Sequence, residues 1–482
     1  MTAHIQGKSR WLALIILCLG DLMIVLDSTV VNVALPSIRT DLGFLETTLV
    51  WVVNAYLLTY GGFLLLGGRL GDLYGHRKLF LIGIVFFTLA SLACGLANSQ
   101  GLLIAARAIQ GLGGAIVSAV ALSLIMIIFT EAEERAKAMG VFGFVIAGGG
   151  SVGVLLGGLL TDLLNWHWVF LVNIPLGAIV YALTLALVPD DHAGEKNERL
   201  DFGGAITVTL SLLLAVYAIV DGNEAGWGSL QTIGLLALAA ILMAAFLVIE
   251  LKVSAPLMPL GLFRLRNLSV ANVASVLWAA AMFAWFFLSA LYMQIVLGYS
   301  PMEVGLAFLP GNLIMGAFSL GLSAKLVNRF GIRAPLAVGL LLAAAGLALF
   351  ARAPVDGTFW IDVMPGMTLL GLGAGIAFNP ILLAAMNDVG PHESGLASGI
   401  VNTSFMMGGA LGLAILASLA AARTANLTAL GASMPVALNA GYQIAFLVGA
   451  VCAAIAGALA LLLRPARPQP EAAGAPAPAE AE

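Results

Sequence analysis

Residues 11–33 read WLALIILCLGDLMIVLDSTVVNV, an apolar run whose only charges are two aspartates. About 20 consecutive apolar residues are enough for a helix to cross the hydrocarbon core of a bilayer. The run is too long for the apolar part of a secretory signal peptide, and no small-residue cleavage site follows it. It therefore predicts a membrane-spanning helix.

The composition of the whole chain also indicates a membrane protein. Of its 482 residues, 61% are hydrophobic and only 10% are charged, whereas a soluble domain carries about 25% charged residues. The net charge of -4 argues against nucleic acid as a partner. The three cysteines, Cys18, Cys94 and Cys452, lie in apolar runs without metal-ligand spacing, so we expect neither a disulfide framework nor a metal site.

The same length rule predicts fourteen spanning helices. The first six fall at 11–33, 48–66, 79–97, 102–128, 139–160 and 169–188. Two more follow at 202–220 and 230–249, and the last six fall at 270–291, 304–322, 335–351, 363–385, 396–421 and 444–463. With both termini in the cytoplasm, 17 of the 21 Lys and Arg residues lie on the cytoplasmic side, as the positive-inside rule requires.

The two halves of the chain repeat each other. GRLGDLYGHR at 68–77 corresponds to AKLVNRFGIR at 324–333, and GLGGAI at 111–116 corresponds to GLGAGI at 371–376. The nearly equal offsets of 256 and 260 residues indicate a duplicated unit in parallel topology, as in secondary transporters. We therefore expect four parts: a six-helix half at 1–189, a linker with two inserted helices at 190–252, a second six-helix half at 253–463, and a disordered cytoplasmic tail at 464–482.

Three charged residues, Asp21, Asp27 and Arg107, lie inside the predicted spans. Each costs at least about 2.5–3.5 kcal/mol at the membrane centre, so each needs a partner or a wet cavity. Asp27 and Arg107 are predicted at similar depths, about 9 Å from the outer end of their spans, and can pair. Asp21 lies near the midplane and is rotated by about 240° from Asp27, so we expect it to face elsewhere.

The Asp27–Arg107 pair has two interpretations. It is either a static ion pair that fixes helix packing or a carboxyl group that binds and releases a proton. Burial favours the neutral carboxyl group and a nearby guanidinium favours the ionised one, so a motion that separates the pair would switch between them. Asp21 is likewise either a polar residue facing a watery cavity or a titrating group.

Two glycine patterns decide against nucleotide chemistry. GGGSVG at 148–153 fits G-x-G-x-x-G, but no strand precedes it and no acidic residue follows at the expected distance, so we expect no dinucleotide site. These glycines either let helices approach closely or form a hinge. The chain contains no Walker sequence, so nothing in it supports direct drive by ATP.

The sequence resembles the major facilitator superfamily, and within it the fourteen-span drug:proton antiporters, over nearly all of the chain to about residue 463. The stretches that carry the resemblance are LDSTVVNVALP at 26–36, GRLGDLYGHRK at 68–78, RAIQG at 107–111, the glycine-rich 149–158, WHWVFLVNIP at 166–175 and YMQIVLGYSP at 292–301. Three positions depart from the family pattern. Leu73 and His76 replace a basic residue and an arginine, and Val154 replaces a proline that would kink the helix.

The resemblance implies a proton-coupled antiporter that exports small hydrophobic or amphipathic compounds such as drugs and antibiotics, with the proton gradient in place of a cofactor. Asp27 would carry the proton, and Arg107 would gate it. Asp21, which is not part of the family pattern, is a second candidate carrier because of its place inside the first span. The cytoplasmic gate motif comprises Gly68, Arg69, Gly71, Asp72, Gly75 and Arg77. The antiporter motif comprises Gly149, Gly153, Gly157 and Gly158. The candidates for the substrate cavity are Asn32, Tyr56, Gln110, Asn173, Tyr292, Gln294 and Asn402.

Other functions stay open at this point. The chain could import a small nutrient with protons, or it could export one dedicated natural product. A membrane-bound enzyme or a sensor is not favoured, because the predicted loops hold no catalytic cluster or soluble domain. We expect a monomeric, multi-pass protein of the bacterial inner membrane whose partners are lipid, protons and a small organic substrate.

Overall fold

The computed structural model of this chain describes residues 7–189, 200–389 and 394–464. All regular structure in these ranges is helical. Thirteen of the described helical segments are long and apolar enough to cross a membrane. The prediction of an all-α, multi-pass membrane protein is therefore confirmed, whereas the predicted tail at 464–482 lies almost wholly outside the described residues.

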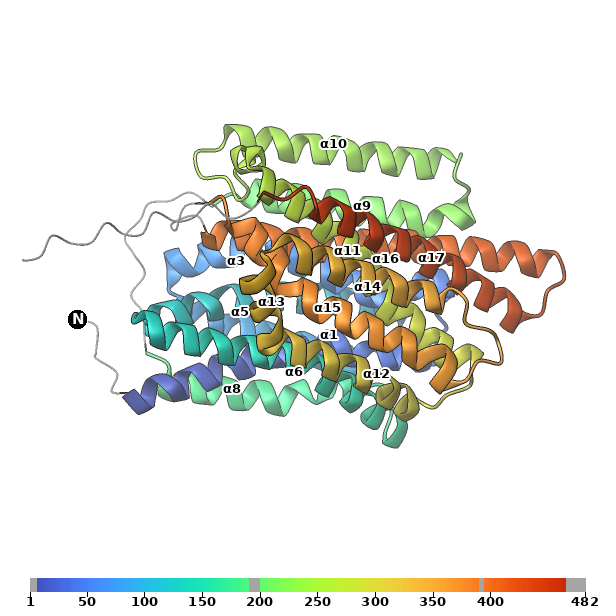
Figure 1. Ribbon diagram of the computed structural model, residues 1–482, viewed down its shortest axis with the longest axis horizontal. Coiled ribbons are helices and arrows are strands. Elements are labelled where there is room, and N and C mark those ends of the chain that lie inside the picture. Colours follow the sequence, from blue (N-terminus) through green and yellow to red (C-terminus); the bar gives the residue numbers. More distant parts are fainter. Residues whose placement is uncertain (1–6, 190–199, 390–393, 465–482) are drawn as a thin grey trace, which may run out of the picture.

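The helices form one elongated bundle (Figure 1). The first group is α1 (Gly7–Leu42), α2 (Glu46–Leu49), α3 (Trp51–Tyr74), α4 (His76–Gly95), α5 (Gln100–Ile128), α6 (Ala132–Leu163), α7 (Trp168–Leu171) and α8 (Asn173–Leu187). The second group is the inserted pair α9 (Phe202–Ala225) and α10 (Leu230–Lys252). The third group is η1 (Leu260–Arg264), α11 (Arg266–Leu291), η2 (Tyr292–Val296), α12 (Pro301–Ala317), η3 (Phe318–Leu322), α13 (Ser323–Phe330), α14 (Arg333–Phe350), η4 (Phe359–Val363), α15 (Met364–Met386), α16 (Ser394–Ala429) and α17 (Met434–Ala460).

The inserted pair lies against the outside of the bundle (Figure 1). Helix α9 packs on α3 and α16, and α10 packs on α9. The most apolar window of α10 is only 17% buried inside the protein. A helix that is apolar and yet largely exposed needs lipid around it, so α10 is a peripheral, lipid-facing element.

Helix α1 extends beyond the predicted span at 11–33. It continues to Leu42, with Pro36 inside it and Arg39 in its last turn. The prediction of the helix end is wrong because hydropathy marks the stretch that suits lipid, while backbone hydrogen bonds continue past it. Asp27 consequently lies near the middle of the helix, 15 residues or about 22 Å from its end at Leu42.

The predicted span at 304–322 is not one regular helix. Helix α12 ends at Ala317, a π-helical turn follows in η3, and α13 continues to Phe330. The Asn379 side chain of α15 donates a hydrogen bond of 3.0 Å to the Ser319 carbonyl oxygen inside this turn. A side chain that donates a hydrogen bond to a backbone carbonyl oxygen disturbs the regular series of helical hydrogen bonds. This accounts for the interruption.

The two halves contain equivalent helix crossings. A Cβ at Gly113 in α5 or at Gly373 in α15 would lie 2.6 Å from a backbone nitrogen of the neighbouring helix. Only glycine permits such close approach at these two matched positions. Gly75 and Gly331 also correspond, and each joins two helices with a positive φ, of 92° and 73°.

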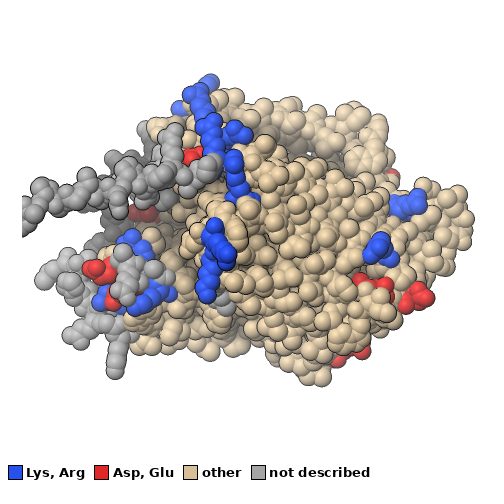
Figure 2. Space-filling model, viewed as in Figure 1, with Lys and Arg blue, Asp and Glu red and all other residues tan. Residues whose placement is uncertain are grey.

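The surface agrees with a membrane environment. On the face that Figure 2 shows, the charged side chains gather towards the two ends of the bundle and leave an uncharged band between them. Charges facing lipid at the bilayer centre are costly, so this band marks the part of the surface suited to hydrocarbon.

Candidate functional site

Asp27 of α1 and Arg107 of α5 form a buried ion pair. An Arg107 terminal nitrogen lies 2.5 Å from Asp27 Oδ2, and the two side chains are 0% and 1% exposed. The pairing predicted from their depths is therefore confirmed.

Two further side chains donate hydrogen bonds to the same carboxyl group. Gln110 Nε2 lies 2.7 Å and Asn173 Nδ2 lies 3.0 Å from Asp27 Oδ1. All three partners of Asp27 are N–H donors, and an ionised carboxylate is a pure acceptor. The described geometry therefore fits the ionised carboxylate, and a protonated carboxyl group would find its O–H facing donors.

Arg107 has partners of its own besides Asp27. Its Nε donates to the Val52 carbonyl oxygen at 2.9 Å, and a terminal nitrogen donates to Gln110 Oε1 at 2.7 Å. The guanidinium also lies over the Tyr56 ring, 4.4 Å from its centroid, where the ring face attracts a cation. Val52, Gln110 and Tyr56 thus contact Arg107 in addition to Asp27.

Ser91 of α4 completes the cluster. It accepts hydrogen bonds from Gln110 at 3.1 Å and from Asn173 at 2.9 Å, and it donates to the Phe170 carbonyl oxygen at 2.9 Å. Through these contacts the cluster joins α1, α4, α5 and α8. Sequence reasoning missed Ser91 because a single serine in an apolar span carries no distinguishing signal.

Asp21 is buried separately from this cluster. Ser118 of α5 donates to Asp21 Oδ1 at 2.6 Å, and Asp21 Oδ2 has no hydrogen-bond partner among the described residues. Asp21 thus faces a different place from Asp27, as expected, although both carboxyl groups contact α5. Packed helices cross at an angle, so one neighbour covers different faces of α1 at different heights.

The motif at 68–77 surrounds the turn at Gly75 between α3 and α4. His76 Nε2 lies 3.2 Å from Asp72 Oδ1, and Arg77 donates to the Leu185 carbonyl oxygen at 2.7 Å. Arg69 donates to the Pro256 carbonyl oxygen at 3.1 Å, in the segment that leads to the second half. The role of Asp72 and Arg77 as a latch between the halves stays a prediction.

The antiporter-motif glycines of α6 face two different helices. A Cβ at Gly157 would lie 2.6 Å from the Val30 carbonyl oxygen of α1, and one at Gly158 would lie 2.6 Å from the Pro301 carbonyl oxygen of α12. Gly149 and Gly153 also face α1. Helix α6 therefore packs tightly against a helix from each half, which fits the close-approach reading of these glycines.

The structure distributes the seven predicted cavity residues among different surroundings. Gln110, Asn173 and Tyr56 belong to the Asp27 cluster, as described above. The other four are Asn32, which donates to the Ser28 carbonyl oxygen of its own helix, Tyr292, which donates to the Pro354 carbonyl oxygen, Gln294, which donates to the Val33 carbonyl oxygen, and Asn402, which lines a pocket.

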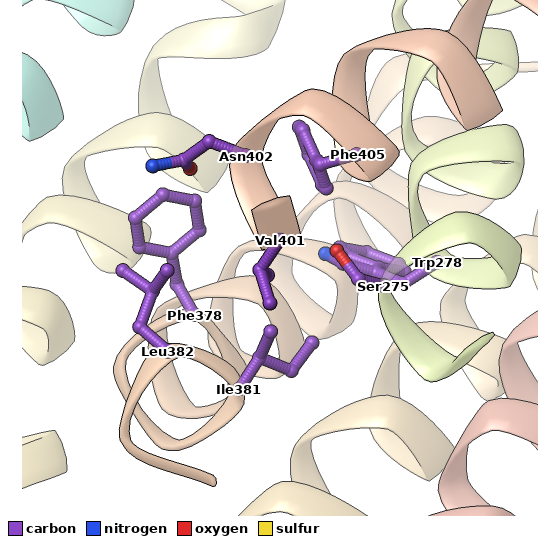
Figure 3. A pocket seen from close by; sticks show the side chains of 8 residues that line it. All are labelled: Ser275, Trp278, Phe378, Ile381, Leu382, Val401, Asn402 and Phe405. Carbon is purple, nitrogen blue, oxygen red and sulfur yellow. The ribbon is translucent and has the colours of Figure 1, made fainter. Parts of the chain in front are cut away.

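That pocket lies between α11, α15 and α16 of the second half (Figure 3). Its lining is mostly apolar and aromatic: Ser275, Trp278, Phe378, Ile381, Leu382, Val401, Asn402 and Phe405. Ser275 Oγ and Trp278 Nε1 are buried and have no hydrogen-bond partner among the described residues. In this conformation the pocket has room for about one water molecule, and the two unpaired donors are themselves buried beside it.

Comparison with known proteins gives the family context. The family model of the Major Facilitator Superfamily matches residues 17–413. The chain is 40% identical to the puromycin resistance protein pur8 of Streptomyces alboniger, over 88% of this chain and 85% of that protein. It is 38% identical to the cephamycin export protein CmcT of Amycolatopsis lactamdurans, over 86% of each. The xylose transporter XylE from E. coli shares the fold, with a TM-score of 0.60 and 15% identity over 92% of this chain and 97% of that one.

Proposed function

We propose that this chain, which belongs to the major facilitator superfamily, exports small hydrophobic or amphipathic organic compounds in exchange for protons. Members of this superfamily are transporters rather than enzymes. The relatives named for puromycin resistance and cephamycin export support antibiotic-like compounds as substrates. The observation that carries the proton part of the proposal is the buried Asp27 cluster.

In this proposal the cluster works as a switch between two charge states. The described arrangement offers Asp27 three donors, so it favours the ionised carboxylate. A proton on Asp27 would remove the attraction to Arg107 and place an O–H against N–H groups. The cluster would then rearrange, and because it joins α1, α4, α5 and α8 and reaches α3 through Val52 and Tyr56, proton binding would be coupled to helix movement.

We assign substrate binding to the region around this pocket in the second half, which must widen from its described size of about one water molecule to admit an organic compound. Ser275 and Trp278 offer donors, and Phe378 and Phe405 offer aromatic surface. Among the described residues that line this pocket, none has a carboxyl, amine or guanidinium group. It therefore suits compounds that present a ring system and a hydrogen-bond acceptor, and it does not select for a charge.

The architecture that we propose has fourteen spans with both termini in the cytoplasm. The segment from α12 through η3 to α13 supplies the fourteenth span beside the thirteen apolar helices. The bias of 17 basic residues out of 21 supports the orientation. The halves at 1–189 and 253–463, the inserted 190–252, a monomeric state and a place in the bacterial inner membrane complete the proposal.

Reconstituted vesicles provide the direct test. Purified protein in vesicles with an imposed pH gradient should accumulate puromycin or a related amphipathic compound without ATP, and a protonophore should abolish the accumulation. Substrate-dependent proton movement in the opposite direction to the substrate supports antiport. Movement of both in the same direction would instead identify a proton-coupled importer, and accumulation that needs ATP would refute the proposal.

A further inference from the structure

Two buried carboxyl groups meet at the foot of the inserted helices, far in sequence from Asp27. Asp201 precedes α9 and caps it, with Oδ1 accepting the Gly204 backbone N–H at 2.7 Å. Glu250 lies near the end of α10, and its Oε2 accepts the Met258 backbone N–H at 2.9 Å. The two residues are only 5% and 4% exposed.

The remaining oxygen of each carboxyl group points into the same small space. Asp201 Oδ2 and Glu250 Oε1 lie 2.6 and 2.8 Å from the point where a Cβ of Gly204 would stand. Neither oxygen has a hydrogen-bond partner, and no Lys or Arg of the described chain forms an ion pair with either group. Two ionised carboxylates in this position would repel each other and would leave two buried acceptors unsatisfied.

The described neighbours in the chain offer such a pair few polar groups. Ala205, next to Gly204, and Leu257, next to Met258, cluster with Leu66, and all three side chains are apolar. The basic residues nearest in the chain are Arg199, which lies outside the described residues, and Lys252, which is exposed. Arg69 of α3 donates a hydrogen bond to the Pro256 carbonyl oxygen. A Ca²⁺ or Mg²⁺ ion would need further oxygen ligands, such as waters, besides these two carboxyl groups.

We propose that Asp201 and Glu250 bind one shared proton, which forms a second proton-binding site separate from Asp27. The proton gives one carboxyl group an O–H that donates to the facing carboxylate oxygen, so both orphan oxygens are satisfied by one hydrogen bond. This site requires neither export nor coupling at Asp27 and therefore does not depend on the proposed function.

The position of the site determines what the shared proton controls. It fastens the start of α9 to the end of α10, and Glu250 also holds the Met258 backbone. Leu257 packs against Leu66 of α3, the helix that carries the motif at 68–77. Loss of the proton therefore loosens the inserted helices, the connection to the second half and one end of α3 together. In the proposed orientation this site is sensitive to cytoplasmic pH.

Glu250→Gln and Asp201→Asn test the proposal because each amide supplies an N–H donor in place of the shared proton. The measurement is the midpoint of thermal unfolding of the purified protein against pH. The folded wild type retains a proton that the unfolded chain releases, so its stability should fall as the pH rises, by up to about tenfold in the folding equilibrium per pH unit. Each variant should lack this component and be at least as stable as wild type at basic pH. Asp221→Asn, an acid at the other end of α9 that accepts from Gln231, should keep the wild-type profile.

A second measurement detects the bound proton directly. The infrared spectrum of the wild type should contain a carbonyl band of a protonated carboxyl group that disappears in Glu250→Gln. An unchanged pH profile in both variants, or the absence of that band, would overturn the proposal. A stabilisation by Mg²⁺ or Ca²⁺ that Glu250→Gln abolishes would identify a cation there instead. Glu250→Gln should retain proton-driven transport, so failure of this proposal is distinguishable from failure at Asp27.

Discussion

Replacement of Asp27 by Asn is the sharpest test of proton coupling. The amide keeps the shape of the carboxyl group but has one acceptor oxygen instead of two. Its NH₂ group must face either Arg107 or the pair Gln110 and Asn173, and all three donate hydrogen bonds to Asp27 in the described cluster. Either orientation sets N–H against N–H and leaves a buried guanidinium without its counter-charge.

The structure sets the size of the expected effect. Removing one partner of a buried ion pair costs about 3–5 kcal/mol. Arg107 keeps its contacts with the Val52 carbonyl oxygen and Gln110 Oε1, so we expect the lower end, about 3 kcal/mol, for the described conformation. If transport passes through a conformation in which Asp27 is protonated, that conformation also accommodates a neutral side chain at this position. The Asp27→Asn variant should then populate it.

Transport assays and thermal unfolding together separate the two interpretations of the pair. A decoupled variant loses about 2.3 kcal/mol of driving force per 100 mV for each proton, which corresponds to about fiftyfold less substrate accumulation, while downhill exchange persists. Asp162→Asn, the same change at an exposed position of α6, should accumulate substrate like wild type. Uphill transport at the wild-type rate in a well-expressed Asp27→Asn protein would show that Asp27 is not the essential carrier.

A purely structural pair gives a different pattern. Asp27→Asn and Arg107→Ala should then each lower the unfolding temperature, the double variant should recover part of the loss, and any remaining transport should still follow the proton gradient. Asp21→Asn is the next variant in that case, because Asp21 is the other buried carboxyl group of α1.

Three further expectations concern packing, substrate binding and topology. Gly157→Ala should destabilise the protein by about 1–3 kcal/mol in thermal unfolding, because its Cβ would meet a carbonyl oxygen of α1, whereas Gly143→Ala in the same helix meets nothing within 4 Å and should be neutral. Trp278→Phe removes an unused donor and should weaken substrate binding by about two- to twelvefold in equilibrium binding assays, and unchanged affinity would argue against the pocket. A reporter fused within 222–228 should read external and one fused between α8 and α9 cytoplasmic; the reverse would contradict the orientation.

The sequence predicts most of the helices and the ion pair because both have strong physical signals. A charge within an apolar run is costly, so Asp27 and Arg107 stand out, and similar depths suggest that they meet. Nothing comparable in the sequence indicates which way a neutral polar side chain points. Gln110 and Asn173 are predicted to line the substrate cavity, yet their amides contact Asp27, since which face of a helix meets which neighbour depends on crossing angles that the sequence does not state.

Local interruptions are beyond sequence reasoning for a similar reason. The π-helical turn at η3 coincides with a hydrogen bond from Asn379, which lies 60 residues away in the chain. The carboxyl pair of Asp201 and Glu250 lies just outside the predicted spans at 202–220 and 230–249, so a search for charges within the spans passes over both residues. Contacts between distant segments decide each of these features.

The buried charged residues are distributed unequally between the two halves. Every buried Asp, Glu, His and Arg side chain in the described ranges precedes residue 253, whereas the buried polar residues after it are neutral. In the proposed mechanism, proton binding at Asp27 would therefore affect the second-half pocket through contacts between the halves. Helix α1 supplies such contacts directly: Val33, six residues after Asp27, accepts a hydrogen bond of 2.8 Å from Gln294, and Val30 meets Gly157 of α6, whose neighbour Gly158 packs on α12. A rearrangement of α1 that follows protonation of Asp27 cannot leave these contacts unchanged, because the packing around Val30 has no free space to absorb it.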